Sequence, residues 1–193
     1  MARHREFDLE KALDRAVDLL WKQGFEKTSV QDLVDHLGVG RGSLYAAFGD
    51  KRGLYLAALD RYRERANAGF AAMLAEAEGV VGAFERLMEA YVDEIIADPE
   101  CRGCFLTNAT TELAARDPEV GRRVAANREH IIQTFREALE RAKKQGEIAI
   151  DKRPLALARF FFNTLQGLRV TAKTTPDPAT LRDIGAVALT VLR

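Results

Sequence analysis

Cysteine, proline and long apolar runs are all scarce in this chain of 193 residues. Two cysteines are too few for a disulfide scaffold, and they favour a reducing compartment. No apolar run reaches the length of about 18 residues that a transmembrane helix needs, and residues 1–6 are too polar to open a signal peptide. These absences predict a soluble, cytoplasmic protein that does not associate with a membrane.

A dominant sign of charge is also lacking, because 29 Lys and Arg balance 29 Asp and Glu. A net charge of zero excludes a globally basic nucleic-acid coat and an acidic tail, but it leaves room for a local basic patch. The three His are scattered without ligand spacing, and no nucleophile elbow or His-Glu-x-x-His motif occurs. We therefore expect no metal, no cofactor and no enzyme activity.

Helix-forming residues such as Ala and Leu are abundant, and they predict an all-α fold. Proline first appears at Pro99, and each of the five prolines follows an Asp, Arg or Thr, as is typical of helix starts and turns. Apolar residues recur at helical spacing between these points. They predict nine helices, at residues 8–23, 29–36, 41–48, 51–78, 80–97, 104–116, 119–145, 152–173 and 178–192.

Two of the short helices are joined by a glycine-containing turn, which predicts a helix-turn-helix over about residues 29–48. The second helix of such a motif enters the major groove of DNA, and apolar residues on its other side hold it to the domain. Leu44 and Phe48 have the spacing of these anchors. The outward positions are Arg41, Gly42, Ser43 and Tyr45.

Residues 28–51, TSVQDLVDHLGVGRGSLYAAFGDK, closely resemble the TetR family of one-component repressors, as does the lead-in LLWKQGF at residues 19–25. The resemblance implies a DNA-binding domain at residues 1–50 and an effector-binding and dimerisation domain at residues 51–193. It also implies a homodimer bound to double-stranded operator DNA. Carried over by position, it implies these DNA contacts: Thr28, Ser29, Arg41, Gly42, Ser43, Tyr45 and Lys51.

The chain departs from the family at several points, among them Ala46 and Ala47, where bulky aromatic or His residues are common and one phosphate contact would be lost. Gly40 stands where the family usually has a Ser that caps the second helix, and Gly caps less well. Residues 1–60 carry nine Lys or Arg against ten Asp or Glu, so this segment is not basic. DNA binding would then depend on a few focused cations, with Arg3 and Arg5 as a possible flexible arm.

A ligand pocket is expected among the middle helices, where amides and hydroxyls accompany aromatic residues. Cys101 and Cys104 form only half a zinc site, but Arg102 and a helix start can activate a thiol for redox or electrophile sensing. Residues 103–118 resemble the sixth helix of a TetR subgroup that begins with Gly-Cys. The candidate ligand-binding residues are Tyr91, Cys104, Phe105, Asn108, Thr111, Phe162, Asn163 and Gln166.

The last two helices carry more apolar surface than one face holds, because Phe160 and Phe161 extend it around the helix at residues 152–173. A helix that is apolar on two sides buries one side in its own core and the other on a partner. The alternative is that both helices merely complete the core of the monomer. The candidate dimer-interface residues are Phe161, Leu165, Leu168, Leu181, Ile184, Gly185, Ala188 and Leu192.

Together these features predict a ligand-responsive repressor that a small organic molecule releases from a palindromic operator. The effector itself is not identified by the sequence. Two alternatives stay open. One is a thiol-based redox or electrophile sensor that uses Cys104. The other is a helical protein-interaction module with a vestigial helix-turn-helix, which the weak basic character of residues 1–60 slightly favours.

Overall fold

The computed structural model describes residues 8–75 and 79–193, and the regular secondary structure of this part is all helix, with no strand. Arg3 and Arg5 lie outside the described residues. The nine predicted helices are found within the described part, so the all-α prediction is confirmed. The helices are α1 (Leu9–Gln23), α2 (Val30–Leu37), α3 (Arg41–Phe48), α4 (Lys51–Ala75), α5 (Val80–Ile96), α6 (Phe105–Glu112), α7 (Pro118–Gln145), α8 (Pro154–Ala172), α9 (Pro178–Leu189) and a short 3-10 turn η1 (Thr190–Leu192).

Aspartate followed by proline starts two of the long helices. Asp117 and Asp177 are the N-caps of α7 and α9, and their carboxylates accept backbone N–H groups of the first turn. Helix α6 ends at Glu112, four residues before the predicted end, because residues 113–116 form a turn that leads to Asp117. No helix in the described part of the chain is both long enough and apolar enough to cross a membrane.

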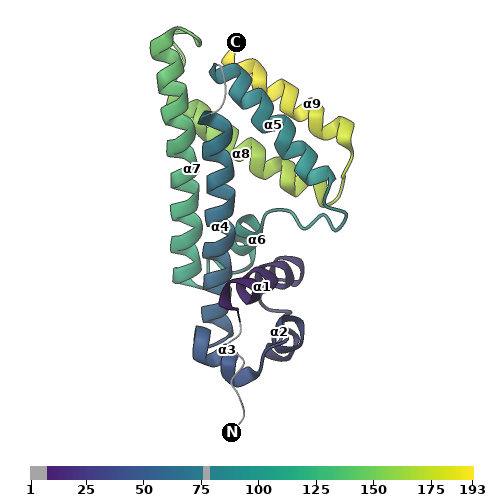
Figure 1. The fold of residues 1–193 in the computed structure, drawn as a ribbon. Helices are drawn as coiled ribbons and strands as arrows, with labels where there is room; N and C mark the ends of the chain where they lie inside the picture. Colours follow the sequence, from purple (N-terminus) through teal and green to yellow (C-terminus); the bar gives the residue numbers. More distant parts are fainter. Residues whose placement is uncertain (1–7, 76–78) are drawn as a thin grey trace.

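The helices form an elongated molecule in which α1, α2 and α3 lie at one end and α5, α8 and α9 at the other (Figure 1). The long helices α4 and α7 run side by side between these ends, and α6 lies beside α1. This arrangement joins the helix-turn-helix to the helical body through α4 and α6.

Two clusters of buried apolar side chains hold the molecule together. The first combines α1, α2 and α3 with Leu54, Tyr55 and Leu59 of α4, and also with Phe105 and Leu106 of α6. The second combines the end of α4 with α5, α7, α8 and α9. The apolar cores therefore divide within α4 rather than at the predicted boundary after residue 50, and α6 belongs to the first core.

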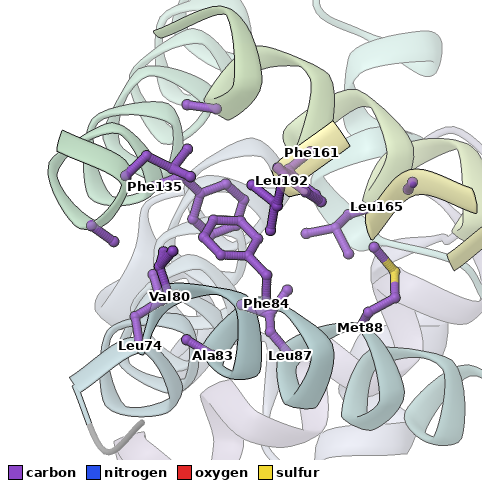
Figure 2. Close-up of a cluster of buried hydrophobic side chains, with 14 of the residues drawn as sticks. Leu74, Val80, Ala83, Phe84, Leu87, Met88, Phe135, Phe161, Leu165 and Leu192 are labelled. Atoms are coloured by element: carbon purple, nitrogen blue, oxygen red, sulfur yellow. The ribbon is translucent and has the colours of Figure 1, made fainter. Parts of the chain in front are cut away.

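An aromatic cluster lies at the centre of the second core (Figure 2). The ring centroid of Phe84 lies 5.4 Å from that of Phe135 and 4.4 Å from that of Phe161. Such close aromatic pairs stabilise the core beyond the burial of their area. Leu165 and Leu192 are turned toward the same cluster.

Most of the side chains that were predicted to form the dimer interface are buried within the subunit. The structure places seven of the eight predicted residues inside the subunit: Phe161, Leu165, Leu168, Leu181, Gly185, Ala188 and Leu192. Only Ile184 is exposed. Since a side chain closed off in its own core offers no surface to a partner, the predicted apolar stripe is the inner face of α8 and α9.

Candidate functional site

The turn between α2 and α3 has the geometry of a helix-turn-helix. Ser29 caps α2 by accepting the N–H of Asp32, and the Asp32 carboxylate accepts the N–H of Ser29 in return. Gly38 ends α2 in the left-handed region with φ 68°, where glycine carries no steric cost. Gly40 begins α3 without a side-chain cap, as the sequence suggested.

Helix α3 is held by its inner side and exposes the predicted outward side. Leu44 is fully buried and Phe48 is half-buried, so both act as anchors. Arg41 and Gly42 are exposed, and 40% of the Tyr45 surface is exposed. Nothing lies within 4 Å of a Cβ built at Gly42, so the backbone there is open to a close approach. Ser43 is half-buried beside them.

The remaining predicted DNA contacts differ in how far their side chains are available to DNA. The Lys51 ammonium lies 4.2 Å from the centroid of the Phe25 ring, at the start of α4. Ser29 is exposed, although its hydroxyl is engaged in the cap of α2. Thr28 differs from the expectation, because it is fully buried and its hydroxyl donates to the carbonyl of Gly24 at 2.6 Å. Its side chain closes the end of α1 and offers no surface to a phosphate.

Ion pairs offset the acidic residues of α1. Asp14 binds Arg61 at 2.9 Å and Arg65 at 2.6 Å, and Arg61 also reaches Glu10 at 2.8 Å. Both arginines belong to α4 and lie just beyond residues 1–60, the segment in which acidic and basic residues are nearly equal in number. The acids of α1 therefore oppose a DNA phosphate less than the count for residues 1–60 implied.

A cavity of about 330 Å³ lies beside the first core, between α1, α4, α5, α6, α7 and α8. Four of the predicted ligand-binding residues line it: Tyr91, Cys104, Phe162 and Gln166. The amide oxygen of Gln166 accepts a hydrogen bond from the hydroxyl of Thr107. This volume lies at the lower end of the range of about 300–1,000 Å³ that is typical of small-molecule sites.

The other four predicted residues do not line the cavity. Phe105 is buried in the first core, with its ring edge-to-face on Tyr55. Asn108 accepts from the ammonium of Lys173 at 2.9 Å and donates to a loop carbonyl. Thr111 is exposed and bonds to the backbone of its own helix, and Asn163 is exposed on the outer face of α8. Each of these predictions required knowing which side of the helix faces the cavity. The sequence alone does not determine the rotation of a helix about its axis.

The sequence analysis missed a buried arginine that lines the cavity. Arg169 is only 4% exposed, and its guanidinium carbon lies 4.5 Å from the centroid of the Tyr91 ring. One terminal nitrogen binds the Glu94 carboxylate at 2.9 Å, whereas Nε has no hydrogen-bond partner in the part of the chain that the structure describes. Arg169 follows Leu165 by four residues on the inner face of α8, so the helical register was a signal that could have found it.

Two phenols accompany Arg169 in the cavity. Burial raises the pKa of Tyr62 well above its usual value, and the nearby thiol of Cys104 raises it further. Burial also raises the pKa of Tyr91. Both hydroxyls therefore stay protonated near neutral pH and are available as hydrogen-bond donors or acceptors.

Helix α6 connects the cavity to the DNA-binding helices. Cys104 lines the cavity at the N-terminus of α6, and Glu112 is the last residue of the helix. The Glu112 carboxylate accepts the backbone N–H groups of Phe25 at 3.2 Å and Glu26 at 2.9 Å, in the turn that leads to α2. A shift of α6 would therefore act directly on this turn.

The exposed helix α3, linked through α4 and α6 to a larger helical body, is the arrangement of a helix-turn-helix DNA-binding regulator. The chain belongs to the TetR family of bacterial regulatory proteins. The N-terminal family model for bacterial regulatory proteins of the tetR family matches residues 12–58. A model for the tetracyclin repressor-like C-terminal domain matches residues 83–187. The protein is thus a helix-turn-helix transcription regulator and not an enzyme.

Relatives of known name support this assignment over the whole chain. The uncharacterized HTH-type transcriptional regulator YezE of Bacillus subtilis is 36% identical and is covered completely, as is this chain. The HTH-type transcriptional repressor ComR of Escherichia coli is 31% identical over 99% of this chain and 90% of its own length. A cysteine mutant of the TetR family regulator CifR, solved with double-strand operator DNA, has a TM-score of 0.90 at 30% identity, with full coverage of both chains.

Proposed function

We propose that the protein is a homodimeric repressor that binds a palindromic operator through α3 and is released by a small organic molecule in the cavity. The observation that carries this proposal is the position of the cavity. Val17 and Trp21 of the DNA-binding domain line one side of it, and Leu165 and Arg169 of α8 line another. An occupant therefore contacts both parts of the molecule. ComR is named a repressor, and the CifR structure contains operator DNA, which agrees with this function.

The outer face of α8 and α9 is the surface that we assign to the dimer. Phe160, Val170, Ile184 and Val187 are exposed there, and Val187 reaches 69%. Gly167 lies on the same face of α8 with nothing within 4 Å of a Cβ, which leaves room for a close approach of another helix. A two-fold contact would bury these residues against the same surface of a second copy.

Release would follow from a movement of α4 and α6. Helix α4 contributes Tyr62 and Phe70 to the cavity, and its first turns contribute Leu54 and Tyr55 to the core of the DNA-binding domain. A ligand that binds more tightly to a shifted position of α4 would favour a different distance between the two α3 helices of the dimer. The ratio of the ligand's affinities for the two conformations sets the size of the population shift.

The test has two stages and uses the full-length protein. The first selects binding sites from a random DNA library, and we expect the enriched sites to contain inverted half-sites about one helical turn apart. The second screens small molecules for loss of the selected DNA by fluorescence anisotropy. The double variant Arg41→Ala/Tyr45→Ala, with its helicity checked by circular dichroism, is the control that should fail to enrich any site. Failure of the wild-type protein to enrich a site would contradict the proposal.

A second candidate function is electrophile sensing by Cys104 on the same scaffold. The observation that favours it is that the Cys104 thiol lines the cavity beside two protonated phenols. We also infer that the chain belongs to the TetR subgroup whose sixth helix begins with Gly-Cys, here Gly103 and Cys104. Addition of the sulfur to an electrophilic carbon would place a bulky group at the start of α6.

This candidate is tested by treating the protein–DNA complex with N-ethylmaleimide. Loss of DNA that Cys104→Ser prevents, and that Cys101→Ser leaves unchanged, would support sensing by Cys104. Equal loss in the Cys104→Ser variant would contradict it. The third hypothesis, an interaction module with a vestigial helix-turn-helix, is weakened by the ion pairs that offset the acids of α1.

A further inference from the structure

The cavity contains a cation whose charge is only partly compensated. Arg169 is almost completely buried, and its Nε has no hydrogen-bond partner among the described residues. Within the same residues, its one ion pair joins a terminal nitrogen to Glu94, whose side chain is 60% exposed. A guanidinium offers five N–H donors in a planar fork, and Glu94 and the Tyr91 hydroxyl engage only part of it here. A buried and incompletely paired charge is costly, which makes this a strong site for an anion.

The other charged residues around the cavity are already paired. Arg65 binds Asp14 at 2.6 Å, and its side chain is 55% exposed. Asp18 lies 3.7 Å from Arg102, whose guanidinium also stacks on Trp21. Among the charged residues that line this cavity, Arg169 is therefore the one with a free and desolvated hydrogen-bonding edge.

The rest of the cavity fits an apolar or aromatic body. Phe70, Met73, Ile131 and Phe162 line it, and apolar atoms make up most of its exposed surface. Trp21 also lines the cavity, and its indole Nε1 is a buried donor without a partner among the described residues. A ligand with one anionic end and an apolar body would satisfy both regions at once.

We propose that the ligand is a small carboxylate with an aromatic or branched apolar body, and that its carboxylate binds the fork of Arg169. This inference rests on the proposed function, because it names the chemistry of the effector in the same cavity. The two carboxylate oxygens match Nε and a terminal nitrogen in a bidentate pair. Glu94 competes for the guanidinium and, being mostly exposed, swings into solvent when the ligand binds.

The single tryptophan of the chain provides the measurement, because Trp21 lines the cavity. The probes are phenylacetate, 3-phenylpropionate and 4-phenylbutyrate, each compared with its neutral primary amide. In the wild-type protein we expect at least one carboxylate to change Trp21 fluorescence with an affinity roughly tenfold or more above its amide, the scale of a charged hydrogen bond.

Three variants separate the role of Arg169 from a structural one. Arg169→Met keeps the packing on Tyr91 and should weaken the carboxylate about tenfold or more, while the amide is unaffected. Glu94→Gln removes the competing anion from an exposed position and should strengthen the carboxylate. This gain is a readout that does not depend on whether Arg169→Met folds. Arg136→Met, which removes a paired guanidinium outside the cavity, is the matched control and should change neither ligand.

The outcomes distinguish this inference from the proposed function. Equal binding of a carboxylate and its amide, no carboxylate binding at all, or a loss in Arg136→Met as large as in Arg169→Met would each overturn the assignment to Arg169. Release of the selected operator by a neutral molecule would then still support the proposed function. Conversely, tight carboxylate binding at Arg169 that leaves the operator complex intact would support this inference and contradict release by the cavity.

Discussion

Gly40 gives the reading helix a start with no side-chain cap. Its backbone, with φ −70° and ψ 148°, suits a serine, and nothing lies within 4 Å of an added Cβ. Gly40→Ser should therefore stabilise the protein by about 0.5 kcal/mol, since a hydroxyl caps α3 and the unfolded chain loses some freedom. Urea unfolding followed by circular dichroism measures the change. A destabilised Gly40→Ser variant would show that another contact needs the glycine.

Lys51 and Arg41 should affect DNA binding in different ways. Lys51 lies at the start of α4 beside α3, where a phosphate contact carries no sequence information. Lys51→Ala should then weaken all DNA sequences alike and lower the salt slope by about one unit. Arg41→Ala should instead relax the preference at one symmetric pair of operator positions by roughly 1–3 kcal/mol.

Anisotropy titrations over a series of salt concentrations and operator variants separate these two effects. Lys144→Ala is the matched control, because Lys144 lies in the last turn of α7, at the end of the molecule away from α3 (Figure 1). Equal losses on every operator variant for Arg41→Ala would make Arg41 another phosphate contact. No loss for either variant would contradict DNA binding by this face of α3.

The outward side of α3 could be predicted from the sequence because it depends on local spacing. Leu44 must face the core, and helical geometry then places Arg41 and Tyr45 outward. The role of Thr28 could not be predicted in this way, since its burial depends on how the end of α1 folds back. Arg169 was missed because an arginine is usually exposed, although its register with Leu165 on α8 pointed inward; its packing on Tyr91 shows the burial.

At the scale of the helices, Arg52 of α4 and Asp117 at the start of α7 form a bidentate pair at 2.6 and 2.8 Å. The hydrogen bond from Arg52 holds the pKa of Asp117 well below its usual value. A carboxyl with a lowered pKa stabilises the folded protein above its unfolded pKa of about 3.9, and this contribution is lost as the pH falls further.

Asp117→Asn should therefore destabilise the protein near neutral pH, and the difference from wild type should shrink below about pH 4. Asparagine still caps α7, so the change isolates the charge. Chemical unfolding at several pH values measures it, and Asp177→Asn, at the N-cap of α9 with Thr180 as its side-chain partner, is the comparison without an arginine. A difference that does not vary with pH would contradict the ion-pair explanation.

At the scale of the whole molecule, substitutions on the exposed outer face of α8 and α9 should act differently from substitutions on their buried inner face. Val187→Glu places a charge on the exposed outer face and should weaken the dimer while the subunit stays folded. Leu181→Glu places a charge in the core, where Leu181 is fully buried, and should unfold the subunit instead. Sedimentation velocity and circular dichroism measure the two effects. A Val187→Glu protein that dimerises as tightly as wild type would contradict the assigned interface.

The sharing of the first core between α1, α4 and α6 limits how the protein can be re-engineered. Phe105 of α6 packs on Tyr55 of α4, and Glu112 holds the turn after α1. A chimera that exchanges only residues 1–50 with a relative would join a foreign α1 to a resident α6 that was shaped for another surface. Residues 1–50 are therefore not a unit that can be exchanged by itself. New operator preferences are therefore better installed by changing exposed side chains of α3, such as Arg41 and Tyr45, than by transplanting the N-terminal helices.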